Sequence, residues 1–125
     1  MQEFRIAVVG AGQTGTPLLK QLLTAPFVTV LGVADLDMTM PGIALAKEHG
    51  VKVTDNFMEL AALGKDVDII IDVTGAPKVR EALRKYMVDS GNDHTLIMHE
   101  RIALLMMSLS AGKVVTGKHG DQEYA

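Results

Sequence analysis

Three closely spaced glycines between an apolar run and a helical segment constrain the fold of this chain more than any other feature. The apolar run "FRIAVV" at 4–9 is followed by Gly10, Gly12 and Gly15, and "TPLLKQLL" continues from 16 to 23. Consecutive apolar residues are typical of a strand that is covered on both faces. The leucines of the next segment recur at helical spacing. Together these features predict a buried strand, a tight turn and a helix that packs back on the strand.

The same alternation of apolar runs and helical segments continues along the chain. We expect strands at 4–10, 28–35, 51–53, 67–75 and 94–98, and a further short strand at 114–116. We expect helices from Gln13 or Thr14 onward, with Pro17 in the first turn, and at 41–50, 56–63, 77–91 and 100–112. This order predicts an α/β fold with a doubly wound, mostly parallel, Rossmann-like sheet as a single layer between helices. The 125 residues suit one domain at 1–117, followed by a polar tail at 118–125.

The spacing of the three glycines matches a loop that holds a dinucleotide. Gly10 allows the sharp turn, Gly12 lets the backbone approach a pyrophosphate, and Gly15 allows close packing of helix on strand. Amide N–H groups and the positive end of the helix then bind the phosphates. A turn that binds nothing needs one glycine but does not require three. We therefore expect a dinucleotide site, with another nucleotide-sized ligand as the alternative.

An acidic residue stands at the end of the second predicted strand. Asp35 lies 20 residues after Gly15, where a carboxylate accepts hydrogen bonds from ribose hydroxyl groups. Its charge repels a 2′-phosphate, and no Lys or Arg follows before Lys47. We therefore expect NAD(H) rather than NADP(H). Asp37 is a weaker candidate for the same role, and a solvated strand-end carboxylate is the purely structural alternative.

Two further strand ends carry polar residues. The loop "TGAP" follows the fourth predicted strand, and Thr74 and Gly75 are candidate cofactor contacts at this edge of the sheet. His99, Glu100 and Arg101 follow the fifth strand. A His and a Glu in such a place can act as acid, base or substrate anchor. A structural or solvated role is the more ordinary interpretation, so we assign no catalytic residue.

Charge and composition argue against several other classes of protein. The net charge is −3, only 4% of residues are aromatic, and no basic block is present, which argues against nucleic-acid binding. Cysteine is absent and the four histidines form no metal-binding pattern, so we expect no metal site. No run reaches the roughly 18 apolar residues of a membrane helix, and the N-terminus is unlike a secretory signal. We expect a cytoplasmic protein with no membrane partner.

Residues 4–90 resemble the N-terminal NAD(P)-binding domains of homoserine dehydrogenases, aspartate dehydrogenases and the glucose-fructose oxidoreductase and inositol dehydrogenase-like families. The resemblance is carried by "RIAVVGAGQTGTPLLKQLL", "VLGVADLD", "VKVTDNFMEL" and "VDIIIDVTGAPKVREALRKYM". It implies that loop 74–77 lies on the nicotinamide side, and that six residues hold the cofactor: Gly10, Gly12, Gln13, Thr14, Gly15 and Asp35. The sugar-oxidoreductase branch has a Glu-Lys-Pro motif with a catalytic Lys after its fifth strand, where this chain has "MHERIA". These families continue into a second domain that holds the substrate.

Two functions fit these features. The first is the NAD(H)-binding domain of an oxidoreductase that lacks its substrate-binding half. The second is a non-catalytic regulatory module that senses NAD(H) or another nucleotide and acts through dimer or partner contacts. Residues 102–107 are apolar without a gap, so the helix 102–109 is either buried in the domain or meets a second copy or a separate substrate or effector domain. A relic that binds nothing is the third alternative.

Overall fold

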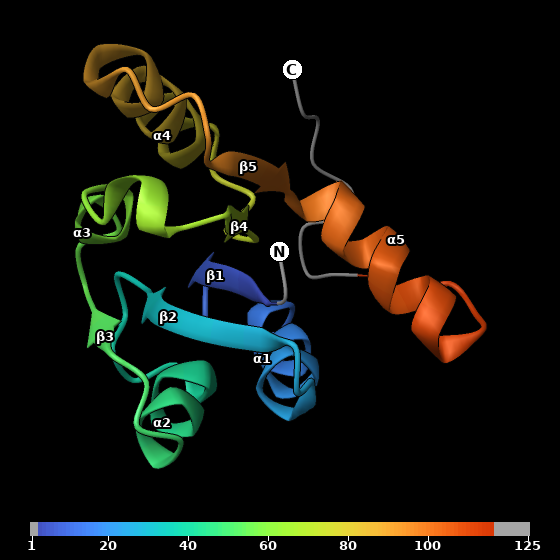
Figure 1. Ribbon diagram of the computed structural model, residues 1–125. Coiled ribbons are helices and arrows are strands. Elements are labelled where there is room, and N and C mark those ends of the chain that lie inside the picture. Colours follow the sequence, from blue (N-terminus) through green and yellow to red (C-terminus); the bar gives the residue numbers. More distant parts are fainter. Residues whose placement is uncertain (1–2, 117–125) are drawn as a thin grey trace.

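A single parallel sheet forms the centre of the molecule (Figure 1). The computed structural model describes residues 3–116, so the tail expected at 118–125 lies outside the described residues. The strands are β1 (Phe4–Val9), β2 (Val28–Ala34), β3 (Val53–Thr54), β4 (Ile69–Asp72) and β5 (Leu96–His99). Every strand pair is parallel, and the order across the sheet is β3-β2-β1-β4-β5. The predicted α/β fold with a parallel sheet is therefore confirmed.

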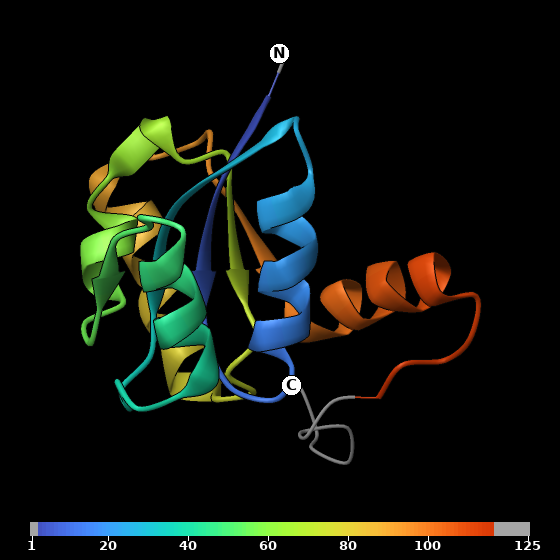
Figure 2. The ribbon, with the colours of Figure 1, turned by 90° about the horizontal axis from the view of Figure 1, so that it is seen from below.

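Helices cover both faces of this sheet (Figures 1 and 2). They are α1 (Gly15–Thr24), α2 (Pro41–Glu48), α3 (Met58–Ala61), α4 (Pro77–Ser90) and α5 (Glu100–Ala111), with a 3₁₀ turn at Gly64–Asp66. Ile6 and Val8 of β1 belong to a core shared with α1, α2 and α5. Ala7 and Val9 point to the opposite face and pack with α3 and α4. Because successive side chains of a strand alternate between faces, both surfaces of β1 are buried, as a doubly wound sheet requires.

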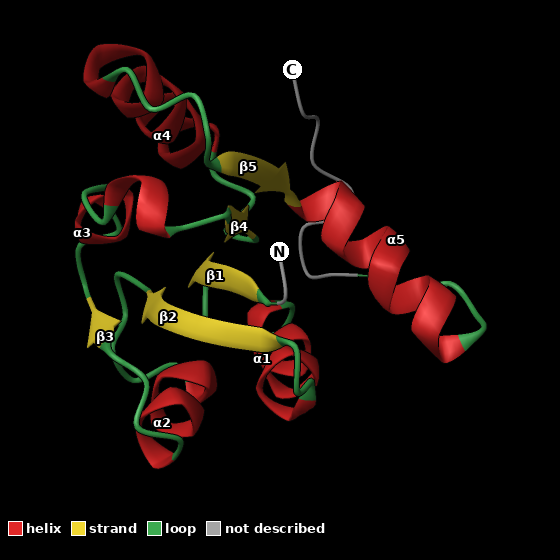
Figure 3. Cartoon of the chain, in the orientation of Figure 1, coloured by secondary structure: helices red, strands yellow, loops and turns green. Residues whose placement is uncertain are grey.

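The strand expected at 114–116 is absent, and this prediction is wrong. Gly112 ends α5 in the left-handed conformation, with φ of +71°, and a loop follows (Figure 3). In that loop the N–H of Val115 donates to Oγ of Ser108 at 2.8 Å, and this hydroxyl itself donates to the carbonyl of Leu104 at 2.7 Å. A helix side chain thus binds the amide that the sequence pattern had assigned to a strand ladder.

The chain reverses its direction across the sheet at β1. From β1 it moves outward through β2 to β3, and it then returns to the other side of β1 to add β4 and β5. The carboxyl ends of β1 and β4 lie side by side, since Val9 pairs with Asp72. Ligands of open α/β sheets bind at this kind of topological switch point, beyond the carboxyl ends of the strands.

Within residues 3–116, no helix has the length and apolar character needed to cross a membrane. The same part of the chain contains no group of three or more His, Asp or Glu residues arranged to hold a metal ion.

Candidate functional site

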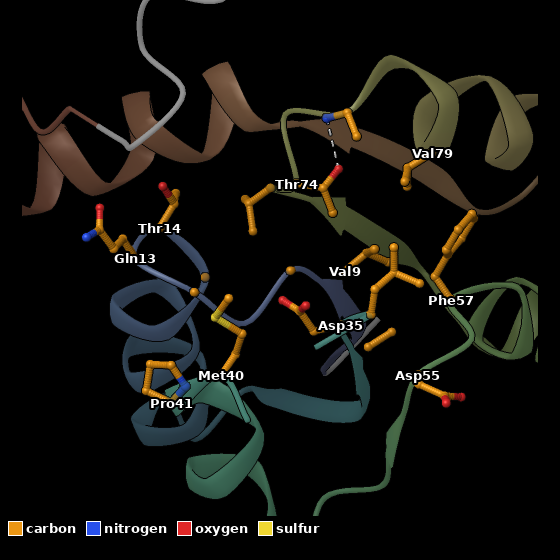
Figure 4. Close-up of a pocket in the computed structure, with 17 residues that line it drawn as sticks. Val9, Gln13, Thr14, Asp35, Met40, Pro41, Asp55, Phe57, Thr74 and Val79 are labelled. Carbon is orange, nitrogen blue, oxygen red and sulfur yellow. Dashed lines mark hydrogen bonds between the residues drawn. The ribbon is translucent and has the colours of Figure 1, made fainter. Parts of the chain in front are cut away.

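A cavity of about 480 Å³ opens at the switch point (Figure 4). This volume falls in the range of small-molecule sites. Seven of the eight predicted site residues line it: Gly10, Gly12, Gln13, Thr14, Gly15, Asp35 and Thr74. The eighth, Gly75, instead lines a smaller neighbouring cavity. Segments far apart in the sequence therefore meet around one hollow, which we call the glycine-loop cavity.

Apolar residues outside the predicted set of site residues complete the wall of this cavity. They include Leu36, Met40, Pro41, Phe57 and Val79. Leu36 to Pro41 come from the loop after β2 and the start of α2, Phe57 follows β3, and Val79 lies in α4. Their position in the sequence could have identified most of them, because residues that directly follow the carboxyl ends of parallel strands lie at the same edge of the sheet. Apolar walls around a few polar groups are typical of sites that hold a ring or a ribose.

The three glycines of the loop have different structural roles. Gly10 has φ of +111°, and a Cβ there would lie 2.9 Å from Cγ2 of Val73. At Gly15 a Cβ would overlap the carbonyl oxygen of Gly10. At Gly12 a Cβ would meet only the sulfur of Met40, at an ordinary 3.7 Å. The fold thus demands glycine at 10 and 15, whereas at 12 the absent side chain leaves backbone open to the cavity.

The N-terminus of α1 meets this loop at Thr14. Thr14 is the N-cap residue of α1, but its side chain makes no capping hydrogen bond. The residue is only 5% exposed, and among the described residues its Oγ1 has no hydrogen-bond partner. An unsatisfied buried hydroxyl costs about 1–3 kcal/mol. A ligand oxygen in the glycine-loop cavity would provide a partner at the end of a helix that favours anions.

Asp35 connects the end of β2 to the glycine loop. Its Oδ2 accepts the N–H of Ala11 at 2.8 Å, and its Oδ1 accepts the N–H of Asp37 at 2.9 Å. A carboxylate has about four acceptor positions, so Asp35 keeps capacity for hydroxyl donors from the cavity. The position of Asp35 after an apolar run indicates the residue as a site candidate, but nothing in the sequence indicates its contact with the loop.

Asp37, the weaker candidate, is not among the residues that line the cavity. Its Oδ1 accepts hydrogen bonds from both the N–H and the hydroxyl of Thr39. These bonds hold the pKa of the Asp37 carboxyl below its ordinary value. Asp37 therefore shapes the turn before α2, and Asp35, the residue directly after β2, is the carboxylate that lines the cavity.

A chain of hydrogen bonds shapes the loop after β4. Oδ1 of Asp72 accepts the N–H of Thr74 at 3.0 Å and its hydroxyl at 2.7 Å. Oγ1 of Thr74 in turn accepts the N–H of Ala76 at 3.1 Å, drawn as a dashed line in Figure 4. The Thr74 hydroxyl, predicted as a ligand contact, thus maintains the turn while the residue lines the cavity.

A second cavity of about 10 Å³, roughly the room that one water needs, lies behind this loop. Its wall is formed by Asp72, Gly75, Ala76, Arg80, His99 and Glu100. Asp72, Arg80 and Glu100 are buried, and we call these three residues with His99 the buried polar cluster. Sequence reasoning noted His99 and Glu100 but missed Asp72 and Arg80, since a strand-end Asp and a helical Arg carry no distinctive motif.

A glycine loop, a strand-end carboxylate and a helix N-terminus at the switch point of a parallel sheet are the features that define dinucleotide-binding α/β domains. No protein-family model matches the chain. A curated relative, acetaldehyde dehydrogenase 2 from Salinispora arenicola, is 33% identical over 85 residues, covering 67% of this chain and 28% of that protein. The chain thus spans less than a third of that relative's length.

Solved structures share the fold. Homoserine dehydrogenase from S. aureus superposes with a TM-score of 0.59 at 15% identity, covering 88% of this chain and 30% of that one. The scyllo-inositol dehydrogenase from Lactobacillus casei, solved with NAD(H) and scyllo-inositol, has a TM-score of 0.59 at 14% identity, covering 89% and 34%. The resemblance to homoserine and inositol dehydrogenases is confirmed at the level of the fold. The similarity to acetaldehyde dehydrogenases was not anticipated from the sequence.

Proposed function

We propose that this chain is the NAD(H)-binding domain of an oxidoreductase and works with a substrate-binding half that lies outside the 125 residues. The observation that carries the proposal is the meeting of the glycine loop and Asp35 around one cavity of about 480 Å³ at the switch point. The dehydrogenase names of the relatives, and the NAD(H) in the scyllo-inositol dehydrogenase structure, support it. The proposed compartment is the cytoplasm.

The residues around the cavity fit a dinucleotide in chemistry as well as in space. The pyrophosphate would bind at Gly10, Gly12, Gln13, Thr14 and Gly15, against the positive end of α1. The missing side chain at Gly12 leaves room for the pyrophosphate to approach the backbone. The buried Thr14 hydroxyl would donate a hydrogen bond to one of its oxygens. When bound, NAD(H) supplies the hydride chemistry, and this domain supplies binding and orientation.

Selection of NAD(H) over NADP(H) is proposed to depend on Asp35. Its remaining acceptor positions would receive the ribose hydroxyl groups, and its charge would repel a 2′-phosphate. The described residues that line the cavity include Asp35 and Asp55 but no Lys or Arg to neutralise an added phosphate. Thr74, which lines the cavity, is proposed as a contact for the far half of the dinucleotide. Gly75, the next residue of the same loop, is proposed as a second contact, although it lines the smaller cavity.

Replacement of Asp35 by alanine tests this assignment. We expect Asp35→Ala to raise the Kd for NADH at least about tenfold, because a charged hydrogen bond contributes about 1.5–3 kcal/mol. The same change should also lower the ratio of the Kd for NADPH to the Kd for NADH, because the charge that repels the 2′-phosphate is removed. Calorimetric titration with NAD, NADH, NADP, NADPH and ADP-ribose measures both effects. Asp37→Ala is the matched control, since Asp37 lies outside the cavity lining. The Kd of this variant for NADH should equal the wild-type value. Equal affinities in all three proteins would contradict the assignment.

A second candidate function is favoured by the outer surface of α5. Ile102, Leu105, Met106 and Leu109 are exposed there, and no charged residue lies between 102 and 112. An exposed apolar surface of this kind marks an interaction site, and an uncharged face meets its own copy without like-charge repulsion. The alternative function is therefore a nucleotide-sensing module that acts through a dimer formed by the helix 102–109.

The dimer predicts a specific effect of a charge at Leu105, which is 53% exposed. The wild-type chain should sediment as a monomer–dimer equilibrium, and Leu105→Glu should shift it fully to monomer. At concentrations where both proteins are monomeric, their melting temperatures should be equal. Sedimentation velocity at several concentrations, with and without NADH, provides the measurement. A wild-type chain that stays monomeric at all concentrations would reject the dimer and favour a separate domain as the partner.

A further inference from the structure

The helix α5 is capped by a titratable side chain. His99 is its N-cap residue, and Nδ1 of the imidazole accepts the N–H of Arg101 at 2.9 Å. None of the other helices described within residues 3–116 has a side-chain cap. A backbone N–H can only donate, so Nδ1 must carry no proton while this bond exists. The cap therefore requires a neutral His99 whose proton is on Nε2.

Charged groups from three elements surround His99. Asp72 of β4 is its register partner across the sheet, Arg80 approaches from α4, and Glu100 and Arg101 follow it in α5. Burial lowers the pKa of His99 below its ordinary value, and the charges of Arg80 and Arg101 act in the same direction. The charges of Asp72 and Glu100 oppose this shift. The lowered pKa favours the neutral imidazole, which is the form that the observed bond from the Arg101 N–H to Nδ1 requires.

The capped end of α5 is connected to the glycine-loop cavity by short contacts. Asp72, beside His99, holds Thr74 through two hydrogen bonds, and Thr74 holds Ala76 through a third. Thr74 and Ala76 line the glycine-loop cavity, and Ala76 also lines the small cavity together with His99. Any molecule that fills the larger cavity therefore contacts the loop that forms one wall of the buried polar cluster.

We propose that His99 is a proton-controlled cap of α5, and that the occupant of the glycine-loop cavity biases its two states. In the neutral state Nδ1 holds the Arg101 amide and fixes the first turn of α5. A proton taken from solvent onto Nδ1 converts this acceptor into a donor, so the bond to the amide breaks and the imidazolium turns toward Asp72 or Glu100. The exposed face of α5 begins at Ile102, directly after this turn. The state of the cap thus controls whether the first turn of α5, from which this exposed apolar face begins, is ordered.

The effect of the ligand rests on the proposed function, namely that the cavity holds NAD(H). The pyrophosphate brings negative charge to the edge of the sheet where His99 lies, and negative charge favours the protonated imidazole. NADH should therefore favour the uncapped state more than NAD⁺, because the oxidised ring carries a compensating positive charge. By linkage, each unit by which NADH raises the pKa of His99 corresponds to about tenfold tighter binding below both pKa values than above them.

Nuclear magnetic resonance of the full 125-residue chain tests the proposal. The imidazole signals of His99 report its titration, and the exchange protection of the Arg101 amide, corrected for the intrinsic rate, reports the cap. Without ligand, protection of Arg101 should be lost as the pH falls through the His99 transition. Saturating NADH should move that transition to higher pH, and NAD⁺ should move it less.

Two variants separate the cap from other effects of pH. His99→Asn keeps an oxygen acceptor at the N-cap but does not titrate, so Arg101 should stay protected across the same pH range. His49→Gln is the control, because His49 lies at the exposed end of α2, and it should behave as wild type. A pH-dependent Arg101 amide in His99→Asn would overturn the cap.

The remaining outcomes distinguish the proposal from the function on which it rests. NADH binding with an unchanged His99 transition would overturn the coupling and leave the cofactor site intact. Failure of all four dinucleotides to bind would overturn the proposed function, and with it the ligand-controlled part of the proposal. The pH dependence of the Arg101 amide in the free protein would still decide whether His99 acts as a proton-controlled cap.

Discussion

Gly12→Val should abolish most dinucleotide binding and leave the fold intact. A Cβ at this position meets only the Met40 sulfur at 3.7 Å, so the domain itself accommodates it. The two methyl groups of valine would extend into the cavity where a pyrophosphate approaches the backbone. Forcing groups into filled space costs about 1–3 kcal/mol. We expect the Kd for NADH to rise about 100-fold, which corresponds to about 2.7 kcal/mol.

Calorimetry with NADH and thermal unfolding should be measured on the same preparations of Gly12→Val. Gly91→Ala is the reciprocal control, since Gly91 ends α4 with φ of +69° and has open space around it. That variant should lower the melting temperature and leave the affinity unchanged. Wild-type affinity in Gly12→Val would show that the glycine loop is not the phosphate site. An unfolded Gly12→Val would show that position 12 is constrained by the fold.

The parts of the fold that sequence reasoning predicted are those with a local signal. Consecutive apolar residues and helical spacing identified the five strands of the sheet and the helices between them, and the glycine spacing identified the loop at 10–15. Strand ends were predicted less well, because pairing partners decide where a strand stops. The expected strand 67–75 is β4 at Ile69–Asp72, since the side chain of Asp72 captures the amide of Thr74 and turns the chain.

The parts that escaped prediction depend on contacts between distant elements. The buried polar cluster brings together Asp72, Arg80, His99 and Glu100 from β4, α4, β5 and α5. No spacing in the sequence predicts that these four residues lie around one small cavity. The hydrogen bond from the N–H of Ala11 to Asp35 likewise joins two loop residues that lie 24 positions apart in the sequence. Phe57 enters the site only because β3 pairs with β2 and brings the loop after it to the same edge of the sheet.

Gly15→Ala should destabilise the domain strongly, in contrast to Gly12→Val. The added Cβ would overlap the carbonyl oxygen of Gly10 and lie 2.7 Å from its carbon. Gly10 cannot readily move away, because its N–H donates to Ala34 at 2.8 Å. Nor can α1 readily shift, because Leu18 and Leu19 are fully buried in the core. We expect a loss of about 3 kcal/mol, which lowers the melting temperature of a domain of this size by about 10 °C or more.

The direction of this change is informative because helix propensity predicts the opposite. Gly15 is the first residue of α1, and alanine within a helix is favoured over glycine by up to about 1 kcal/mol. A raised melting temperature in Gly15→Ala would mean that loop and helix separate easily and that the contact with Gly10 is unimportant. A lowered one, measured by calorimetric unfolding without ligand, would establish that Gly15 serves the packing of α1 on the loop. Two glycines three positions apart would then have separable roles: Gly15 for the fold and Gly12 for the ligand.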